Sequence, residues 1–408
     1  MNSKPDLAAS TIVHGARLLS GVVVDILMSD GIIVEIKPST PLHPQYADTV
    51  IDGSDYLALP PLVEPHAHLD KAYLSERIDN LTGDLMGAIH GIEAARESLS
   101  YEDTRERAER AAHLLSARGV QLVRSHADTT VDSGLRNIEA LLEVKQRCVS
   151  FIDMQVAALV GWPLSGTHGA DNRALARAAI DAGVDVIGGC PHLDDEPADA
   201  LQFLFELASE YDVPLDLHAD ENTRLDSSDL ERCADLKIST GSTVSVAASH
   251  CVALGMQATD HQHRVAEKVA EADISVITLP LTNLYLQGRD RHSHVPRGLT
   301  PVSLLSAHGV NVAAGGDNLQ DPFNPLGKGD PLETAGFLVL AGHVLTNEAF
   351  HAVTINAQRA MGHQPVDISV GAPANFLLIR AQSLREAVAM QSTERVVIRH
   401  GQRLHSRL

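Results

Sequence analysis

Short apolar runs recur through the middle of the chain, and each is followed by a stretch in which apolar residues stand three or four positions apart. The runs are continuous rather than alternating, which is typical of parallel strands covered on both faces. The stretches between them are predicted to be amphipathic helices. The eight runs lie at residues 57–68, 121–128, 153–160, 184–191, 213–220, 243–251, 273–280 and 310–318.

Eight strand–helix units predict an α/β fold, specifically a (β/α)8 TIM barrel. Several of the helical stretches end in glycine before the next run, as expected at helix C-termini. A doubly wound sheet is the alternative fold. No GxGxxG sequence follows the first run, which disfavours the dinucleotide-binding version of that alternative.

The two ends of the chain have a different pattern, in which short apolar stretches alternate with Gly and Asp turns. This pattern predicts strands at both termini. We therefore expect residues 1–58 and 366–408 to form one small β-sandwich domain, with the barrel in residues 59–365.

Polar residues capable of binding metal stand where several of the apolar runs stop. His66 and His68 end the first run, His218 the fifth, His250 the sixth and Asp317 the eighth. The carboxyl ends of all barrel strands open at one mouth, so these side chains are expected to converge. A lone histidine at a strand end is more often a hydrogen-bonded core residue, which is our expectation for His126 in the second run.

His66 and His68 differ from such a lone histidine, because residues i and i+2 of a strand face the same side. Together with His218 and Asp317 they make a nitrogen and oxygen ligand set, which suits one divalent ion, zinc or iron. Such an ion lowers the pKa of a bound water to about 7, so hydroxide becomes available at neutral pH.

Glu221 follows His218 by three residues, so its carboxylate is a candidate to carry a proton from water to a leaving amine. A solvated loop carboxylate is the alternative interpretation. His250 is expected to hydrogen-bond the hydroxide or the developing oxyanion. Asp317 is expected to act both as a ligand and as the first acceptor of the water proton.

Composition narrows the range of partners. The formal charge is −21, from 32 basic and 53 acidic residues, which disfavours nucleic acid and anionic membranes as partners. The four cysteines form no CxxC pair, so neither disulfides nor a thiolate zinc site is expected. The N-terminus lacks an apolar signal region and no stretch is long enough to span a bilayer, so we expect a cytoplasmic protein.

The chain resembles the metal-dependent amidohydrolase superfamily, within it the cytosine deaminase-like branch. The resemblance is carried, in this order, by "LPPLVEPHAHLDKAY", "QLVRSHADT", "HADEN", "VAASHCVAL", "LPLTNLYLQGR" and "GGDNLQDPFNPLGKGDPLETA". It implies one divalent metal held by His66, His68, His218 and Asp317, with Glu221 as proton shuttle and His250 above the bound water. It also implies a small-molecule substrate and a homo-oligomer.

The substrate pocket departs from that of cytosine deaminases. Val160 stands where they carry a glutamine that binds the pyrimidine, and Asn318 replaces an aspartate. Because the valine side chain cannot form the hydrogen bonds that the glutamine makes, cytosine is expected to be a poor substrate. Lys71 adds a cation near the mouth, where it contacts the substrate or pairs with Glu64 or Asp70. "HLDK" also resembles the isopropylammelide-type hydrolases.

Three further residues are candidates for substrate contact: Trp162 and Phe323 as stacking surfaces for a flat ring, and Gln287 in the segment after the seventh run. The expected function is a metal-dependent hydrolytic deaminase of a small nitrogen heterocycle, in which hydroxide attacks a ring carbon and ammonia leaves. The alternatives are release of an alkylamine from an aminotriazine, hydrolysis of a cyclic amide, and a non-catalytic scaffold.

Overall fold

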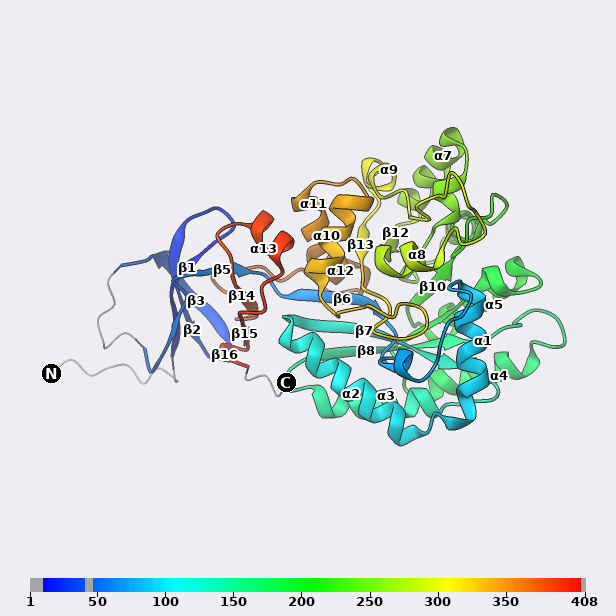
Figure 1. Cartoon of the computed structure of the whole chain (residues 1–408), viewed down its shortest axis with the longest axis horizontal. Coiled ribbons are helices and arrows are strands. Elements are labelled where there is room, and N and C mark those ends of the chain that lie inside the picture. The colour runs from blue at the N-terminus through cyan, green and yellow to red at the C-terminus, as the bar shows by residue number, and fades with distance from the viewer. Residues whose placement is uncertain (1–9, 41–46, 405–408) are drawn as a thin grey trace.

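The computed structural model describes residues 10–40 and 47–404. Two sheets organise these residues: a parallel sheet at the centre of the larger part and a second sheet beside it (Figure 1). The first nine residues, on which the expectation of a cytoplasmic protein partly rests, lie outside the described ranges.

The parallel sheet has eight strands, and each is hydrogen-bonded to its neighbour in chain order. Each of the eight predicted runs overlaps one strand of this sheet, so the predicted TIM barrel is confirmed; the start of the first run, at residues 57–59, belongs instead to a strand of the second sheet. The strands are β6 (Leu62–Ala67), β7 (Val120–Thr129), β8 (Asp153–Val160), β9 (Val186–Gly189), β10 (Leu215–Ala219), β11 (Val246–His250), β12 (Ile274–Thr278) and β13 (Val312–Ala314).

Helices surround the barrel and cover its strands (Figure 1). They are α1 (Leu85–Ala95), α2 (Tyr101–Ala117), α3 (Arg136–Cys148), α4 (Ala170–Asp181), α5 (Pro197–Tyr211), α6 (Asp229–Thr240), α7 (Thr259–Glu271), α8 (Pro280–Leu286), α9 (Val302–Ala307), α10 (Pro331–Ala341), α11 (Thr346–Ala352) and α12 (Ile355–Ala360). Among the described residues, none of the helices is long and apolar enough to cross a membrane.

Helix α2 illustrates how the local sequence determines where a helix begins and ends. The Ser100 side chain accepts a hydrogen bond from the Asp103 N–H and so caps the first turn. The helix ends before Gly119, whose φ of 95° is easy only for glycine. A Cβ at this position would lie 2.8 Å from a Leu377 methyl group, so the turn into β7 requires glycine for space as well.

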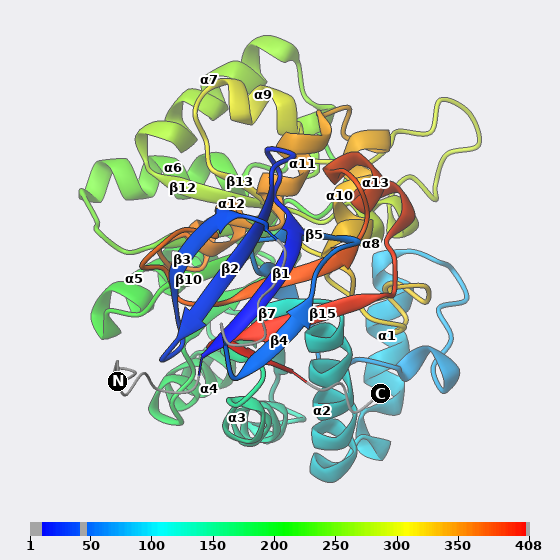
Figure 2. The ribbon, with the colours of Figure 1, turned by 90° about the vertical axis from the view of Figure 1, so that its left-hand side faces the viewer.

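Both ends of the chain contribute to the second sheet, as predicted (Figure 2). Its strands are β1 (Thr11–Arg17), β2 (Val23–Ser29), β3 (Ile32–Pro38), β4 (Thr49–Asp52), β5 (Tyr56–Leu59), β14 (Phe376–Arg380), β15 (Arg395–Arg399) and β16 (Gln402–Arg403), with α13 (Leu384–Met390) between β14 and β15. The sheet buries an apolar core of its own. The predicted boundaries at residues 58/59 and 365/366 stay a prediction.

The barrel closes between its first and last strands at the level of the candidate ligands. The Asp317 N–H donates to the His66 carbonyl at 3.0 Å, and the His68 N–H donates to the Asp317 carbonyl at 3.2 Å. Below them, the Glu64 carboxylate accepts the Gly316 N–H with both oxygens at 3.0 Å. The closure of the fold therefore fixes three of the candidate ligands relative to one another.

A buried ion pair joins the second sheet to the barrel. Arg395 of β15 lies 2.6 Å from the Asp330 carboxylate at the start of α10, and both side chains are only 2% exposed. Asp330 also caps α10 by accepting the Leu332 N–H. Removing one partner of such a pair leaves a buried charge without compensation.

We therefore expect Asp330→Ala to lower the free energy of unfolding by about 3–5 kcal/mol. Urea denaturation followed by circular dichroism measures the change. Asp226→Ala is the matched control, because Asp226 pairs with Arg224 at the surface, where the side chains are 73% and 65% exposed. Equal stability of the two variants would contradict the role given to Asp330.

Candidate active site

Four candidate ligands converge at the mouth of the barrel. His218 Nε2 lies 3.2 Å from His66 Nε2 and 3.1 Å from His68 Nε2. Asp317 Oδ1 lies 3.3 Å from His68 Nε2 and 3.7 Å from His66 Nε2. The structure thus brings together all four residues that the sequence predicted as metal ligands.

The spacing of these atoms supports a metal site. Ligand atoms about 2.0–2.1 Å from a tetrahedral zinc ion lie about 3.3–3.4 Å from one another, close to the four distances above. His66, His68 and His218 offer ligand atoms within 4.8 Å of one another, and Asp317 falls in a second such group with His66 and His250. The environment of Asp317 is also that of a ligand, because both of its carboxylate oxygens are buried without a hydrogen-bond partner among the described residues. If His218 Nε2 carried a proton, that proton could form a good hydrogen bond to only one of the neighbouring atoms. A cation among the three Nε2 atoms and Asp317 Oδ1 could contact more than one of them.

A chain of hydrogen bonds orients His66. Burial raises the pKa of Asp216, but His126 and Arg124 outweigh this effect, so the net pKa is lowered and the carboxylate is ionised. Ser249 Oγ therefore donates to Asp216 Oδ1 at 3.1 Å and accepts from His66 Nδ1 at 2.8 Å. This arrangement leaves the lone pair of His66 on Nε2, the atom that faces His218.

Burial keeps the three imidazoles neutral. It lowers the pKa of His66, His68 and His218 well below the usual value, and nearby cationic or imidazole groups lower it further. Neutral imidazole is the form that binds metal. The cluster is therefore ready to bind a cation at neutral pH without first releasing protons from these rings.

Glu221 and His250 lie beside the cluster. Burial, with a smaller contribution from Asp317, raises the pKa of Glu221 well above its usual value. His250 Nδ1 is 3.0 Å from the Asn283 side-chain oxygen and 3.5 Å from Glu221 Oε1, and its Nε2 has no partner among the described residues. The ring is thus fixed at one nitrogen, while the other is available to water or substrate.

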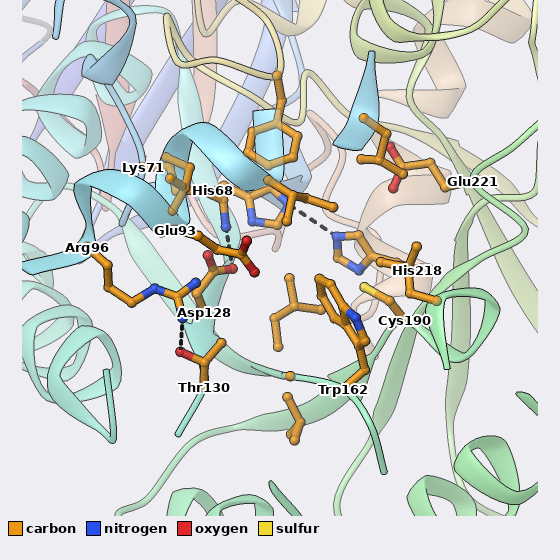
Figure 3. A pocket seen from close by; sticks show the side chains of 18 of the residues that line it. His68, Lys71, Glu93, Arg96, Asp128, Thr130, Trp162, Cys190, His218 and Glu221 are labelled. Atoms are coloured by element: carbon orange, nitrogen blue, oxygen red, sulfur yellow. Dashed lines mark hydrogen bonds and ion pairs between the residues drawn. The ribbon is translucent and has the colours of Figure 1, made fainter. Parts of the chain in front are cut away.

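These residues share one cavity of about 230 Å³. His68, His218, Glu221, His250 and Asp317 line it. Figure 3 shows Lys71 and Asp128 on one side of the cavity, with His218 and Glu221 on the other. The predicted substrate residues Lys71, Val160, Trp162, Asn318 and Phe323 also line it.

Several predicted residues have contacts that the sequence did not reveal. Lys71 pairs with Asp128 at 2.5 Å rather than with Glu64, and lies 3.8 Å from Asp70. Gln287 does not line the cavity; its amide donates to the Glu221 carbonyl at 3.2 Å.

Asn318 is held by its neighbours in the cavity wall. Its amide nitrogen donates to Asp321 at 2.9 Å, and its oxygen accepts from Thr282 at 3.1 Å. His126 is buried as expected. However, neither ring nitrogen has a hydrogen-bond partner among the described residues, and the ring lies against His66 with centroids 4.1 Å apart.

Sequence reasoning missed Asp128, Ser249 and Asp216. Asp128 had a detectable signal, because it follows His126 by two residues in β7 and so shares its face of the strand. Ser249 and Asp216 lie in apolar strands one position before His250 and two before His218. No spacing in the sequence indicates that these two residues meet.

The chain is similar to known proteins along most of its length. Residues 72–405 match the model of the amidohydrolase family. A pterin deaminase of Rhizobium rhizogenes is 31% identical over 386 residues, which cover 92% of this chain and 86% of that protein.

Two solved structures are similar along almost the whole chain. A 5-methylcytosine deaminase from Klebsiella pneumoniae, solved with 5-fluorocytosine, has a TM-score of 0.88 and 32% identity, covering 97% of this chain and 98% of the other. An N-isopropylammelide isopropylaminohydrolase from Burkholderia multivorans has a TM-score of 0.84 and 27% identity over the same shares. These three similar proteins are thus two deaminases and an aminohydrolase.

The hydrogen bond to His66 generates a prediction. We expect Ser249→Ala to weaken zinc binding about 10- to 100-fold, because the imidazole loses its orienting partner but remains present. Competition with a chromophoric chelator measures the affinity. Ser239→Ala, at an exposed position of α6, is the matched control and should bind zinc like the parent protein. An unchanged affinity in Ser249→Ala would show that the bond does not support a ligand.

Proposed function

Because the chain belongs to the amidohydrolase family, we propose that it is a metal-dependent hydrolytic deaminase of a small nitrogen heterocycle, releasing ammonia. Membership makes it a hydrolase acting on carbon–nitrogen bonds other than peptide bonds, as predicted. The observation that carries the proposal is the convergence of His66, His68, His218 and Asp317, with the four distances above at 3.1–3.7 Å. All of them except His66 line a cavity that Glu221 and His250 also line.

The four converging residues would hold one divalent ion, zinc or iron. When bound there, the ion supplies a Lewis acid and lowers the pKa of water. His66 presents its Nε2 lone pair because of Ser249 and Asp216. The Asp317 side chain is held in place by backbone bonds to β6, at a φ of 64° that non-glycine residues rarely adopt.

Glu221 is proposed to move the proton. A carboxyl group with a raised pKa is suited to accept a proton from water and return it to the leaving nitrogen at neutral pH. His250, fixed by Asn283, keeps its Nε2 free to hydrogen-bond the attacking water or the developing negative charge on oxygen. The two side chains are 3.5 Å apart, so they act on the same reacting atoms.

The cavity supports a flat, neutral ring as substrate. Val160 contributes apolar surface to the wall, and the faces of Trp162 and Phe323 offer stacking. The names of similar proteins, pterin deaminase and 5-methylcytosine deaminase, support ammonia release from an aminopteridine or aminopyrimidine. Cytosine itself remains a predicted poor substrate, because Val160 offers no hydrogen bond to its edge.

Release of an alkylamine from an aminotriazine is the second candidate function. It is supported by the similarity to the isopropylaminohydrolase and by the apolar face of α1, where Leu85, Ile89 and Ile92 line the cavity and could contact an alkyl group. Hydrolysis of a cyclic amide, a cytoplasmic location and a homo-oligomeric state are further predictions from the sequence.

A substrate panel tests the proposal. Purified zinc- or iron-loaded protein is incubated with aminopyrimidines, aminopteridines, aminotriazines, N-alkylaminotriazines and cyclic amides. Ammonia and alkylamine are quantified separately. We expect ammonia from an aminopyrimidine or aminopteridine and little from cytosine. Alkylamine as the main product would favour the second function, and no product from any member would contradict both.

Glu221→Gln separates catalysis from metal binding. We expect it to keep its metal, since it removes no ligand, and to lose about 10²- to 10⁴-fold in kcat, since it removes the proton carrier. Metal analysis and steady-state kinetics on the best substrate of the panel measure the two effects. Glu210→Gln, at an exposed position of α5, is the control. Full activity in Glu221→Gln would assign proton transfer to another group.

A further inference from the structure

A buried ion pair forms part of the cavity wall opposite Glu221 (Figure 3). Lys71 Nζ lies 2.5 Å from Asp128 Oδ1, and Lys71 is only 4% exposed. The Asp128 carboxylate is 21% exposed, and both residues line the cavity. A buried pair of this kind is rarely a net source of stability, so its place in the wall of the candidate active site suggests another role.

The pair is held rigidly. The Asp128 N–H donates to Asp70 Oδ2 at 2.9 Å, and the Asn137 amide donates to the Asp128 carbonyl at 3.2 Å. Burial opposes charge on both partners, but their mutual attraction outweighs it and lowers the pKa of Asp128 while raising that of Lys71. The site therefore presents a fixed ammonium beside a fixed carboxylate.

Each partner has hydrogen-bonding capacity left over. Among the described residues, Lys71 Nζ donates only to Asp128 Oδ1, and Asp128 Oδ2 accepts no hydrogen bond. An ammonium carries three N–H donors and a carboxylate two acceptor oxygens. The wall thus offers a donor and an acceptor side by side.

We propose that Lys71 and Asp128 recognise the ring amide of the substrate, a C=O next to an N–H. Lys71 donates to the ring carbonyl, and Asp128 accepts the neighbouring ring N–H. This inference rests on the proposed function and narrows its substrate class to amino-oxo rings in which the amide N–H adjoins the carbon that bears the amino group, as in 2-amino-4-oxopyrimidine. In cytosine that N–H lies on the far side of the carbonyl from the amino carbon. A diamino ring presents N–H groups in place of the carbonyl, so Lys71 would face a donor.

The surroundings agree with this orientation. Lys71 Nζ lies over the Phe323 ring, 5.8 Å from its centre, so the ion pair and this aromatic face adjoin the same part of the cavity. Two other residues of the wall are less suited to hydrogen-bond a substrate. Val160 has no polar side-chain atom, and the Asn318 amide is already engaged by Asp321 and Thr282.

Binding measurements test recognition of the ring amide independently of catalysis. Metal-loaded Glu221→Gln protein is titrated calorimetrically with 2-amino-4-oxopyrimidine and with 2,4-diaminopyrimidine. We expect the oxo ring to bind at least about 100-fold more tightly, because a site built to donate to a carbonyl rejects an amino group. Equal dissociation constants would overturn the inference.

Replacing the Lys71 ammonium should remove the preference for the oxo ring over the diamino ring. In Lys71→Met/Glu221→Gln we expect the ratio of the two dissociation constants to fall below about 10. If this variant loses its metal or its circular dichroism spectrum, Lys71→Met/Asp128→Leu/Glu221→Gln replaces it, because an apolar pair leaves no uncompensated charge. A ratio that stays near the parent value in a folded variant would overturn the inference.

The two proposals fail in different ways. If the parent protein prefers the oxo ring but releases no ammonia from any amino-oxo ring, then deamination is wrong while recognition of the ring amide stands. If it releases ammonia equally from both rings and binds them equally, then deamination stands and the role of Lys71 and Asp128 is wrong.

Discussion

The hydrogen bonds that close the barrel between β6 and the turn after β13 determine the geometry of the candidate site. They join the backbones of His66, His68 and Asp317 directly, so the side chains of these residues start from fixed positions. The Glu64 carboxylate holds the same junction from below, and a Cβ at Gly315 would lie 2.6 Å from it, so the close approach requires glycine there. Closure of the fold and assembly of the ligand cluster are therefore one event, and His218 from β10 completes the set.

This arrangement has an electrostatic consequence. Buried, neutral imidazoles and a buried carboxylate with no hydrogen-bond partner among the described residues are unfavourable on their own. A divalent cation would supply the missing partner to the Asp317 carboxylate and would also bind the Nε2 atoms of the three imidazoles. Glu221 and the Lys71–Asp128 pair lie on opposite sides of the same cavity (Figure 3). We propose that a flat ring binds between them. Glu221 transfers the proton on one side of the ring, and Lys71 and Asp128 hydrogen-bond its edge on the other.

The features that follow from strand periodicity and strand order, namely the barrel and the convergence of the candidate ligands, could be predicted from the sequence. The i, i+2 spacing of His66 and His68 placed both on one face, and the barrel rule brought His218 and Asp317 to the same mouth, although they lie far along the chain. Contacts between side chains of different strands could not be predicted in this way. The pairing of Lys71 with Asp128 rather than with Glu64 depends on which face of β7 turns toward β6. The contact of Gln287 with the Glu221 backbone depends on where α8 ends.

The most direct test of the central claim is anomalous X-ray scattering from crystals of the purified protein, recorded on both sides of the zinc and iron absorption edges. We expect a single strong peak about 2.0–2.2 Å from the Nε2 atoms of His66, His68 and His218 and from Asp317 Oδ1. A metal-loaded crystal with no peak among these four atoms, or with its ion bound elsewhere, would contradict it.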